Sequence, residues 1–191
     1  MTCQRLLAVE NLETFRALEA YAWIDRRGLD VLAMYRGDMD MPNKDAAEVI
    51  RNRPEPIWGF FDFDPAGLVM ANSVPPVRLE CVILPSQAWL RKASNSSRGR
   101  QLFDSPFAAF GRSLDHAEHP EVIALWHVMK SLRSAMTQER MLSADAPQMQ
   151  GGNRRGRHAR PASQKPTAPL SLSWHNLPTT DLAKLPSHIW S

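Results

Sequence analysis

The sequence is poor in the features that define several classes of protein. It has two cysteines, Cys3 and Cys81, which are too few for a disulfide framework and are expected to be buried free thiols. No apolar run approaches the roughly 20 residues that a membrane-spanning helix needs. Arg5 interrupts the first apolar run, so no signal peptide is visible, and we expect a cytoplasmic protein without membrane contact. No Gly-x-Gly-x-x-Gly follows a predicted strand, which argues against a dinucleotide site.

Charge is spread unevenly along the 191 residues. The formal net charge is +3, but residues 143–191 hold six Lys and Arg against two Asp and Glu. Residues 143–169 are rich in Gly, Arg, Pro, Ser and Gln, and we expect them to form a disordered basic linker. Residues 170–191 are expected to form a short segment that could dock on the domain. The basic run of the linker could touch nucleic-acid phosphates nonspecifically, although a solvated linker is the simpler interpretation. It comprises Arg154, Arg155, Arg157 and Arg160.

Apolar runs alternate with helical patterns over residues 1–142 and predict one α/β domain. Strands are expected at 5–9, 30–35, 57–61 and 77–84, and helices between them at 11–22, 43–53 and 65–73. Connections of this length favour right-handed crossovers and a parallel sheet. After Pro85 the signals weaken: a polar loop is expected at 94–100 and a helical extension at 121–142.

Three acidic residues follow predicted strands. Glu10 ends the first strand, and Asp62 and Asp64 leave the third, with Asp64 also placed to cap the next helix ahead of Pro65. Because parallel strands place their carboxyl ends along one edge, where open α/β sheets bind ligands, we expect these carboxylates to converge. Clustered carboxylates repel, which raises a pKa or favours a hard cation such as Mg²⁺.

The amino-acid sequences of two of these segments resemble a known family. Val9-Glu10-Asn11-Leu12-Glu13-Thr14-Phe15 and Asp62-Phe63-Asp64-Pro65-Ala66-Gly67-Leu68 are similar to the Toprim domain of topoisomerases, primases and certain nucleases. The closest likeness is to the nuclease subunit of Wadjet plasmid-defence systems, and a more distant one is to topoisomerase VI and the meiotic break-forming proteins. The resemblance covers roughly residues 4–90.

The resemblance implies a Rossmann-like parallel sheet and a divalent-metal site. Glu10, Asp62 and Asp64 would be the catalytic ligands of Mg²⁺, with Mn²⁺ as a possible substitute, and DNA phosphodiesters would be the substrate. Glu10 could instead carry a proton. Members of the family carry DNA-binding regions ahead of this domain, whereas here the first strand begins almost at Met1. We therefore expect a partner protein to supply DNA recognition.

The sequence also allows other roles for these acidic residues and for the domain. Asp64 could be only a helix cap, and Asp62 only an acid at the end of a strand. Asp38 and Asp40 form a second acidic pair at the same predicted edge, whereas Gln138-Glu139 is expected to face solvent. The domain could also be a non-catalytic module of a defence or repair complex. A phosphatase of the haloacid dehalogenase type fits less well, because that family places its Asp-x-Asp on the first strand.

Overall fold

A computed structural model describes residues 3–24, 30–37 and 42–145. Four parallel strands form one sheet in the order β2-β1-β3-β4. The strands are β1 (Arg5–Val9), β2 (Val31–Tyr35), β3 (Ile57–Phe60) and β4 (Leu79–Val82). The predicted α/β class and parallel sheet are therefore confirmed, as are the free cysteines, of which Cys81 is buried and Cys3 partly buried.

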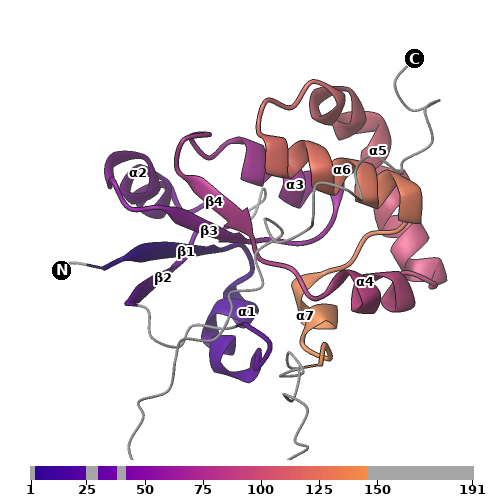
Figure 1. Cartoon of the computed structure of the whole chain (residues 1–191), viewed down its shortest axis with the longest axis horizontal. Coiled ribbons are helices and arrows are strands. Elements are labelled where there is room, and N and C mark those ends of the chain that lie inside the picture. Colours follow the sequence, from indigo (N-terminus) through magenta and orange to yellow (C-terminus); the bar gives the residue numbers. More distant parts are fainter. Residues whose placement is uncertain (1–2, 25–29, 38–41, 146–191) are drawn as a thin grey trace, which may run out of the picture.

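Helices flank the sheet and extend beyond β4 (Figure 1). The helices before β4 are α1 (Leu12–Arg16), the 3₁₀ turn η1 (Leu18–Ala20), α2 (Lys44–Asn52) and α3 (Pro65–Asn72). Those after it are α4 (Gln87–Ala93), α5 (Ser97–Asp115), α6 (Pro120–Leu132) and α7 (Gln138–Met141). α3, α5 and α6 pack on one another beside β4, and α7 returns to the part of the sheet near α1 (Figure 1).

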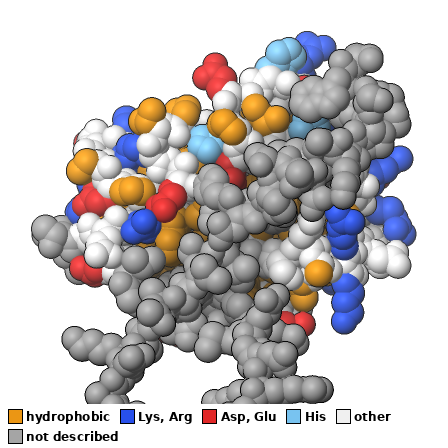
Figure 2. Space-filling view, viewed as in Figure 1, with side chains coloured by type: hydrophobic (Ala, Val, Ile, Leu, Met, Phe, Trp, Pro, Cys, Tyr) orange, Lys and Arg blue, Asp and Glu red, His pale blue; other side chains and the backbone are white. Residues whose placement is uncertain are grey.

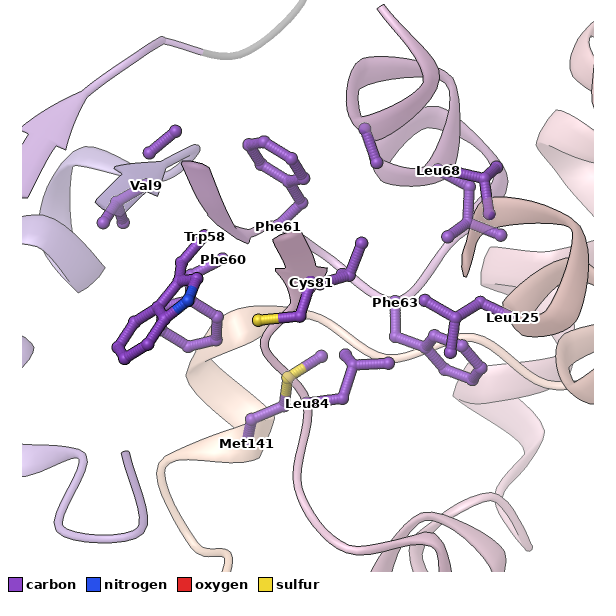
Figure 3. Close-up of a cluster of buried hydrophobic side chains, with 14 of the residues drawn as sticks. Val9, Trp58, Phe60, Phe61, Phe63, Leu68, Cys81, Leu84, Leu125 and Met141 are labelled. Carbon is purple, nitrogen blue, oxygen red and sulfur yellow. The ribbon is translucent and has the colours of Figure 1, made fainter. Parts of the chain in front are cut away.

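β1, β3 and β4 are largely buried because most of their side chains are apolar on both faces, as expected for parallel strands covered by helices, whereas the edge strand β2 is partly buried. Leu6, Leu7, Ala8 and Val9 have no exposed surface, and neither has Phe60. Residues from β1, β3, β4, α3, α6 and α7, and from the segments that follow β3 and β4, share the same core, and Figure 3 shows ten of them with labels. They are Val9, Trp58, Phe60, Phe61, Phe63, Leu68, Cys81, Leu84, Leu125 and Met141.

Local capping explains where several helices begin. Asn11, Asn43 and Asp64 each accept a hydrogen bond from a backbone N–H in the first turn of α1, α2 and α3, respectively. Pro65 occupies the first position of α3, where its missing N–H costs nothing. These three helix starts agree with the sequence patterns.

The boundaries of the first helix and of the fourth strand were predicted wrongly. The helix expected over 11–22 ends at Arg16 and is followed only by the 3₁₀ turn η1. The strand expected from residue 77 begins at Leu79, because Val77 lies in a turn closed by the Arg78 N–H and the Pro75 carbonyl, 2.9 Å apart. Val77 is 96% exposed in consequence.

Two predictions about the later part of the domain are also wrong. The polar loop expected at 94–100 is in large part the first turn of α5, which starts at Ser97. The helix expected over 121–142 is divided into α6 and α7, because Arg133 adopts a left-handed conformation (φ 44°) that stops α6. The segment between them forms a short antiparallel bridge from Met136 to Phe63.

Candidate active site

Glu10 and Asp62 lie side by side at the carboxyl ends of adjacent strands. β1 pairs with β3 so that Val9 lies opposite Phe60, which places Glu10 beside the residues that leave β3. The Glu10 Oε2 atom accepts a hydrogen bond of 2.9 Å from the Asp62 backbone N–H. Glu10 is 8% exposed, so this carboxylate is held in a fixed position within the protein.

Asp64 lies two residues further on and starts α3. Its Oδ1 atom accepts a hydrogen bond of 2.7 Å from the Gly67 N–H, so the predicted capping role is real. Gly67 is needed here, because a Cβ atom at this position would lie 2.1 Å from the Asp62 carbonyl oxygen. α3 therefore packs directly on the backbone that carries Asp62.

A third element, α7, fixes Asp62 from the other side. The Asp62 Oδ1 atom accepts a hydrogen bond of 2.7 Å from the Gln138 backbone N–H. The Gln138 side chain donates to the Phe60 carbonyl at 2.8 Å and accepts from the Asn11 N–H at 2.9 Å. Gln138 thus joins the ends of β1 and β3 while its backbone binds Asp62.

Burial and mutual repulsion make these acids reluctant to ionise. Burial raises the pKa of Glu10 to about 8, and the charges of Asp62 and Asp64 add to the effect. Burial raises the pKa of Asp62 to about 7, with further contributions from Asp64 and Glu139. The pKa of Asp64 is raised as well, again mainly by burial. Nearby positive charge would therefore favour all three carboxylates.

The cation Arg36 lies near this acidic group. Arg36 follows β2, the strand next to β1, and its charge acts on Glu10. Its guanidinium donates a hydrogen bond of 3.1 Å to the Ser73 hydroxyl. Burial lowers the pKa of Arg36, and the charge of Glu10 opposes that effect. A phosphate bound beside Glu10 would therefore find a guanidinium within the same region.

The donor set suits a hard cation, which prefers carboxylate oxygens. Each of the three carboxylates has one oxygen engaged by a backbone N–H: Glu10 by Asp62, Asp62 by Gln138, and Asp64 by Gly67. Within residues 3–24, 30–37 and 42–145, no three His, Cys, Asp or Glu side chains are arranged as a ready metal-binding group. Mg²⁺ sites commonly use one or two carboxylates and complete their coordination with water and substrate phosphates. The residues present fit that mode of binding.

Residues 1–149 match a family described as "Domain of unknown function (DUF7281)". The chain belongs to this family. Comparisons with curated proteins and with solved structures found no match. In the described part of this DUF7281 protein, no helix is both long and apolar enough to cross a membrane.

Two residues of the DUF7281 domain that were expected to face solvent belong to this site. Gln138 is fully buried, so its predicted exposure is wrong. Glu139 is exposed as expected, but its Oε1 atom accepts a hydrogen bond of 2.7 Å from the Asn11 side chain, and its charge acts on Asp62. Helical spacing could not reveal either role, because the partners lie far away in the sequence. Arg36 was also missed, and its only signal is its position directly after a strand.

Other candidates from the sequence lie elsewhere or outside the described residues. Asp38 and Asp40 fall in the segment 38–41, and the basic run from Arg154 to Arg160 falls in 146–191; the structure describes neither segment. The predictions made for these residues therefore stay predictions.

Proposed function

We propose that this chain is a divalent-metal-dependent protein of the Toprim type that acts on DNA phosphodiesters. The observation that carries the proposal is the contact between the Glu10 carboxylate and the Asp62 backbone at the shared end of β1 and β3. Asp64 lies two residues beyond; its charge and that of Asp62 raise the pKa of Glu10, and its charge also raises the pKa of Asp62. The Wadjet nuclease subunit supplies the analogy, and cytoplasmic anti-plasmid or anti-phage defence is the corresponding setting.

Each residue has a distinct task in this proposal. Asp62 and Asp64, with Glu10, would hold Mg²⁺, which supplies charge stabilisation at the phosphate when it is bound. With a pKa of about 8, Glu10 could alternatively hold a proton near neutral pH, on the Oε1 atom that does not face the Asp62 N–H. Arg36 would bind a non-bridging phosphate oxygen beside them.

A second function is supported by the hydrogen bonds themselves. All three carboxylates already accept backbone N–H groups and so help to hold β1, β3, α3 and α7 together. A chain that keeps these acids for structural reasons alone would be a non-catalytic Toprim-fold module of a defence or repair complex. The two functions differ in whether a metal ion binds.

Substitution of Asp62 by Asn tests the first function. Asn keeps an oxygen that can accept the Gln138 N–H, so the fold should survive, whereas the charge that favours a cation is lost. Ligand binding to the native state alone contributes RT ln(1 + [L]/Kd), roughly 2.7 kcal/mol at a hundredfold excess over Kd. We expect Mg²⁺ or Mn²⁺ to raise the melting temperature of the wild type and not that of Asp62→Asn.

Plasmid nicking should follow the same pattern, with the partner protein added where one is found. Asp45→Asn on α2 is the matched control, since Asp45 is exposed and lies in another helix. It should retain both the thermal shift and any nicking. A wild-type protein whose melting ignores Mg²⁺ and Mn²⁺, and which leaves plasmid intact, would favour the non-catalytic module.

A further inference from the structure

The described domain carries a cluster of basic side chains around the junction of α4 and α5. Between Glu80 and Asp104 the chain has four Lys and Arg and no Asp or Glu: Arg91, Lys92, Arg98 and Arg100. All four side chains are exposed. Together with Arg140 they are called here the α4–α5 basic surface.

The fold brings these residues together around the junction of two helices. Arg91 and Lys92 lie in the last turn of α4, and Arg98 and Arg100 lie in or next to the first turn of α5, only a few residues later. Arg140 reaches the same junction from α7, because its Nη2 atom donates a hydrogen bond of 3.1 Å to the Ala93 carbonyl. Figure 2 shows Lys and Arg side chains gathered on the side of the molecule where Figure 1 has α4 and α5.

The four cations of α4 and α5 differ in their ion pairing from several others in the domain. Several cations elsewhere in the domain are paired, as Arg5 is with Glu80 and Lys130 with Asp115. Within the described residues, no ion pair joins Arg91, Lys92, Arg98 or Arg100 to a carboxylate. The start of the 19-residue helix α5 adds the partial positive charge of a helix N-terminus. The combined potential favours a polyanion.

α7 connects the basic surface with the carboxylates. Its three consecutive residues bind in turn to each part: Gln138 to Asp62, Glu139 to Asn11, and Arg140 to the end of α4. A strand of nucleic acid that follows the basic surface would therefore pass beside the ends of β1 and β3. No other described segment has both a run of unpaired cations and a direct link to the acidic group.

We propose that the α4–α5 basic surface binds the phosphate backbone of duplex DNA and guides it to the carboxylates of Glu10, Asp62 and Asp64. This inference rests on the proposed function for its choice of substrate, and it adds the surface by which the domain itself holds DNA. Recognition is nonspecific, because the contacts are made to phosphates and not to bases.

The test is DNA binding measured without catalysis. Fluorescence anisotropy of a labelled duplex is recorded with the full chain, in chelator, over a series of salt concentrations. The pairs Arg98→Gln/Arg100→Gln and Arg91→Gln/Lys92→Gln each remove two phosphate contacts. Each pair should weaken binding and lower the slope of log K against log salt by about 2. Because the pairs lie on different helices, one remains informative if the other disturbs folding.

Two controls separate this surface from other cations. Lys44→Gln/Arg51→Gln makes the same change of charge on exposed residues of α2 and should leave binding unchanged. All variants are also made in a chain whose basic run, Arg154, Arg155, Arg157 and Arg160, is replaced by Gln. Loss of all DNA binding on replacement of that run alone, or equal effects of the α2 pair and the α4–α5 pairs, would overturn the proposal.

These experiments can contradict the DNA-binding proposal and the nuclease proposal independently of each other. DNA binding that depends on Arg98 and Arg100, in a protein that never nicks plasmid, would support the proposed α4–α5 basic surface and contradict the proposed nuclease activity. Nicking that depends on Asp62 but not on these arginines would support the proposed nuclease activity and contradict the proposed role of the α4–α5 basic surface.

Discussion

At the scale of single residues, Gln138 holds more of the site together than any of the acids. Its side chain donates to the Phe60 carbonyl and accepts from the Asn11 N–H, its backbone N–H binds Asp62, and its carbonyl accepts from the Tyr21 hydroxyl at 3.2 Å. Both side-chain partners are backbone groups at the ends of strands. A buried backbone group without a partner costs free energy comparable to its desolvation.

Replacing Gln138 by Leu should therefore destabilise the domain strongly. It leaves the Asn11 N–H without a partner, at about 1–3 kcal/mol, and removes one of the two hydrogen bonds of the Phe60 carbonyl, which still accepts from the Glu10 N–H. The free energy of unfolding should therefore fall by about 2–4 kcal/mol. Urea denaturation measures the change. Gln101→Leu on the exposed surface of α5 makes the same substitution and should stay within about 0.5 kcal/mol of the wild type. Equal stability of the two variants would contradict the role given to Gln138.

At the scale of elements, Gly67 of α3 and Gly111 of α5 differ in the space that surrounds them. A Cβ atom at Gly67 would lie 2.1 Å from a backbone oxygen of Asp62, whereas the nearest atoms to one at Gly111 would belong to the Phe107 ring, at 3.6 Å. At the first distance the Cβ atom would clash with a backbone atom, which cannot rotate aside as a side chain can. The second is ordinary van der Waals contact.

The two glycine-to-alanine substitutions should therefore have opposite signs. Gly67→Ala forces α3 away from Asp62 and should destabilise the domain by about 1–3 kcal/mol, the usual cost of overpacking. Gly111→Ala removes the entropic cost of a glycine in a helix interior and should stabilise it by about 0.5–1 kcal/mol. Thermal melting of both variants measures the two changes in stability. A destabilised Gly111→Ala would show that α5 is packed more tightly there than the structure indicates.

The strands and capped helices of the first part could be predicted from sequence because their signals are local. An apolar run, followed by Asn or Asp and then a helical pattern, defines both an element and its boundary. α5 was missed because its first turn holds Arg98, Gly99 and Arg100, and Pro106 lies inside it. The end of α6 was missed because Arg133 takes a conformation usually left to glycine.

The positions of the acids at the site could also be predicted from local sequence signals, whereas the positions of their hydrogen-bond partners could not. Glu10 and Asp62 each follow a strand, and parallel strands must end on one side. Gln138 comes 76 residues after Asp62, and its burial depends on how α7 returns to the sheet. No period or motif in the sequence carries that information.

At the scale of the whole molecule, the buried acids should make stability depend on pH. The pKa of Glu10 rises to about 8 and that of Asp62 to about 7 on folding, so the native state keeps protons that the unfolded chain releases. Stability from these groups is therefore full below their ordinary pKa values and is lost as pH rises towards about 8.

The corresponding measurement is urea denaturation in chelator at several values between about pH 5 and pH 8. Glu10→Gln keeps an acceptor for the Asp62 N–H but cannot ionise, so its stability relative to the wild type should increase across this range. Glu48→Gln, an exposed residue of α2, serves as the control and should run parallel to the wild type. A constant difference between Glu10→Gln and the wild type would show that Glu10 ionises normally in the folded protein.

The bridge between Phe63 and Met136 also has a consequence for how the protein is made. Chain growth on the ribosome delivers all four strands well before Met136 and Gln138 emerge. The nascent sheet can form while Asp62 still lacks the donor that α7 later provides, and water reaches the acids during that interval. The end of the sheet that carries Glu10 and Asp62 is thus completed only when synthesis has passed α7.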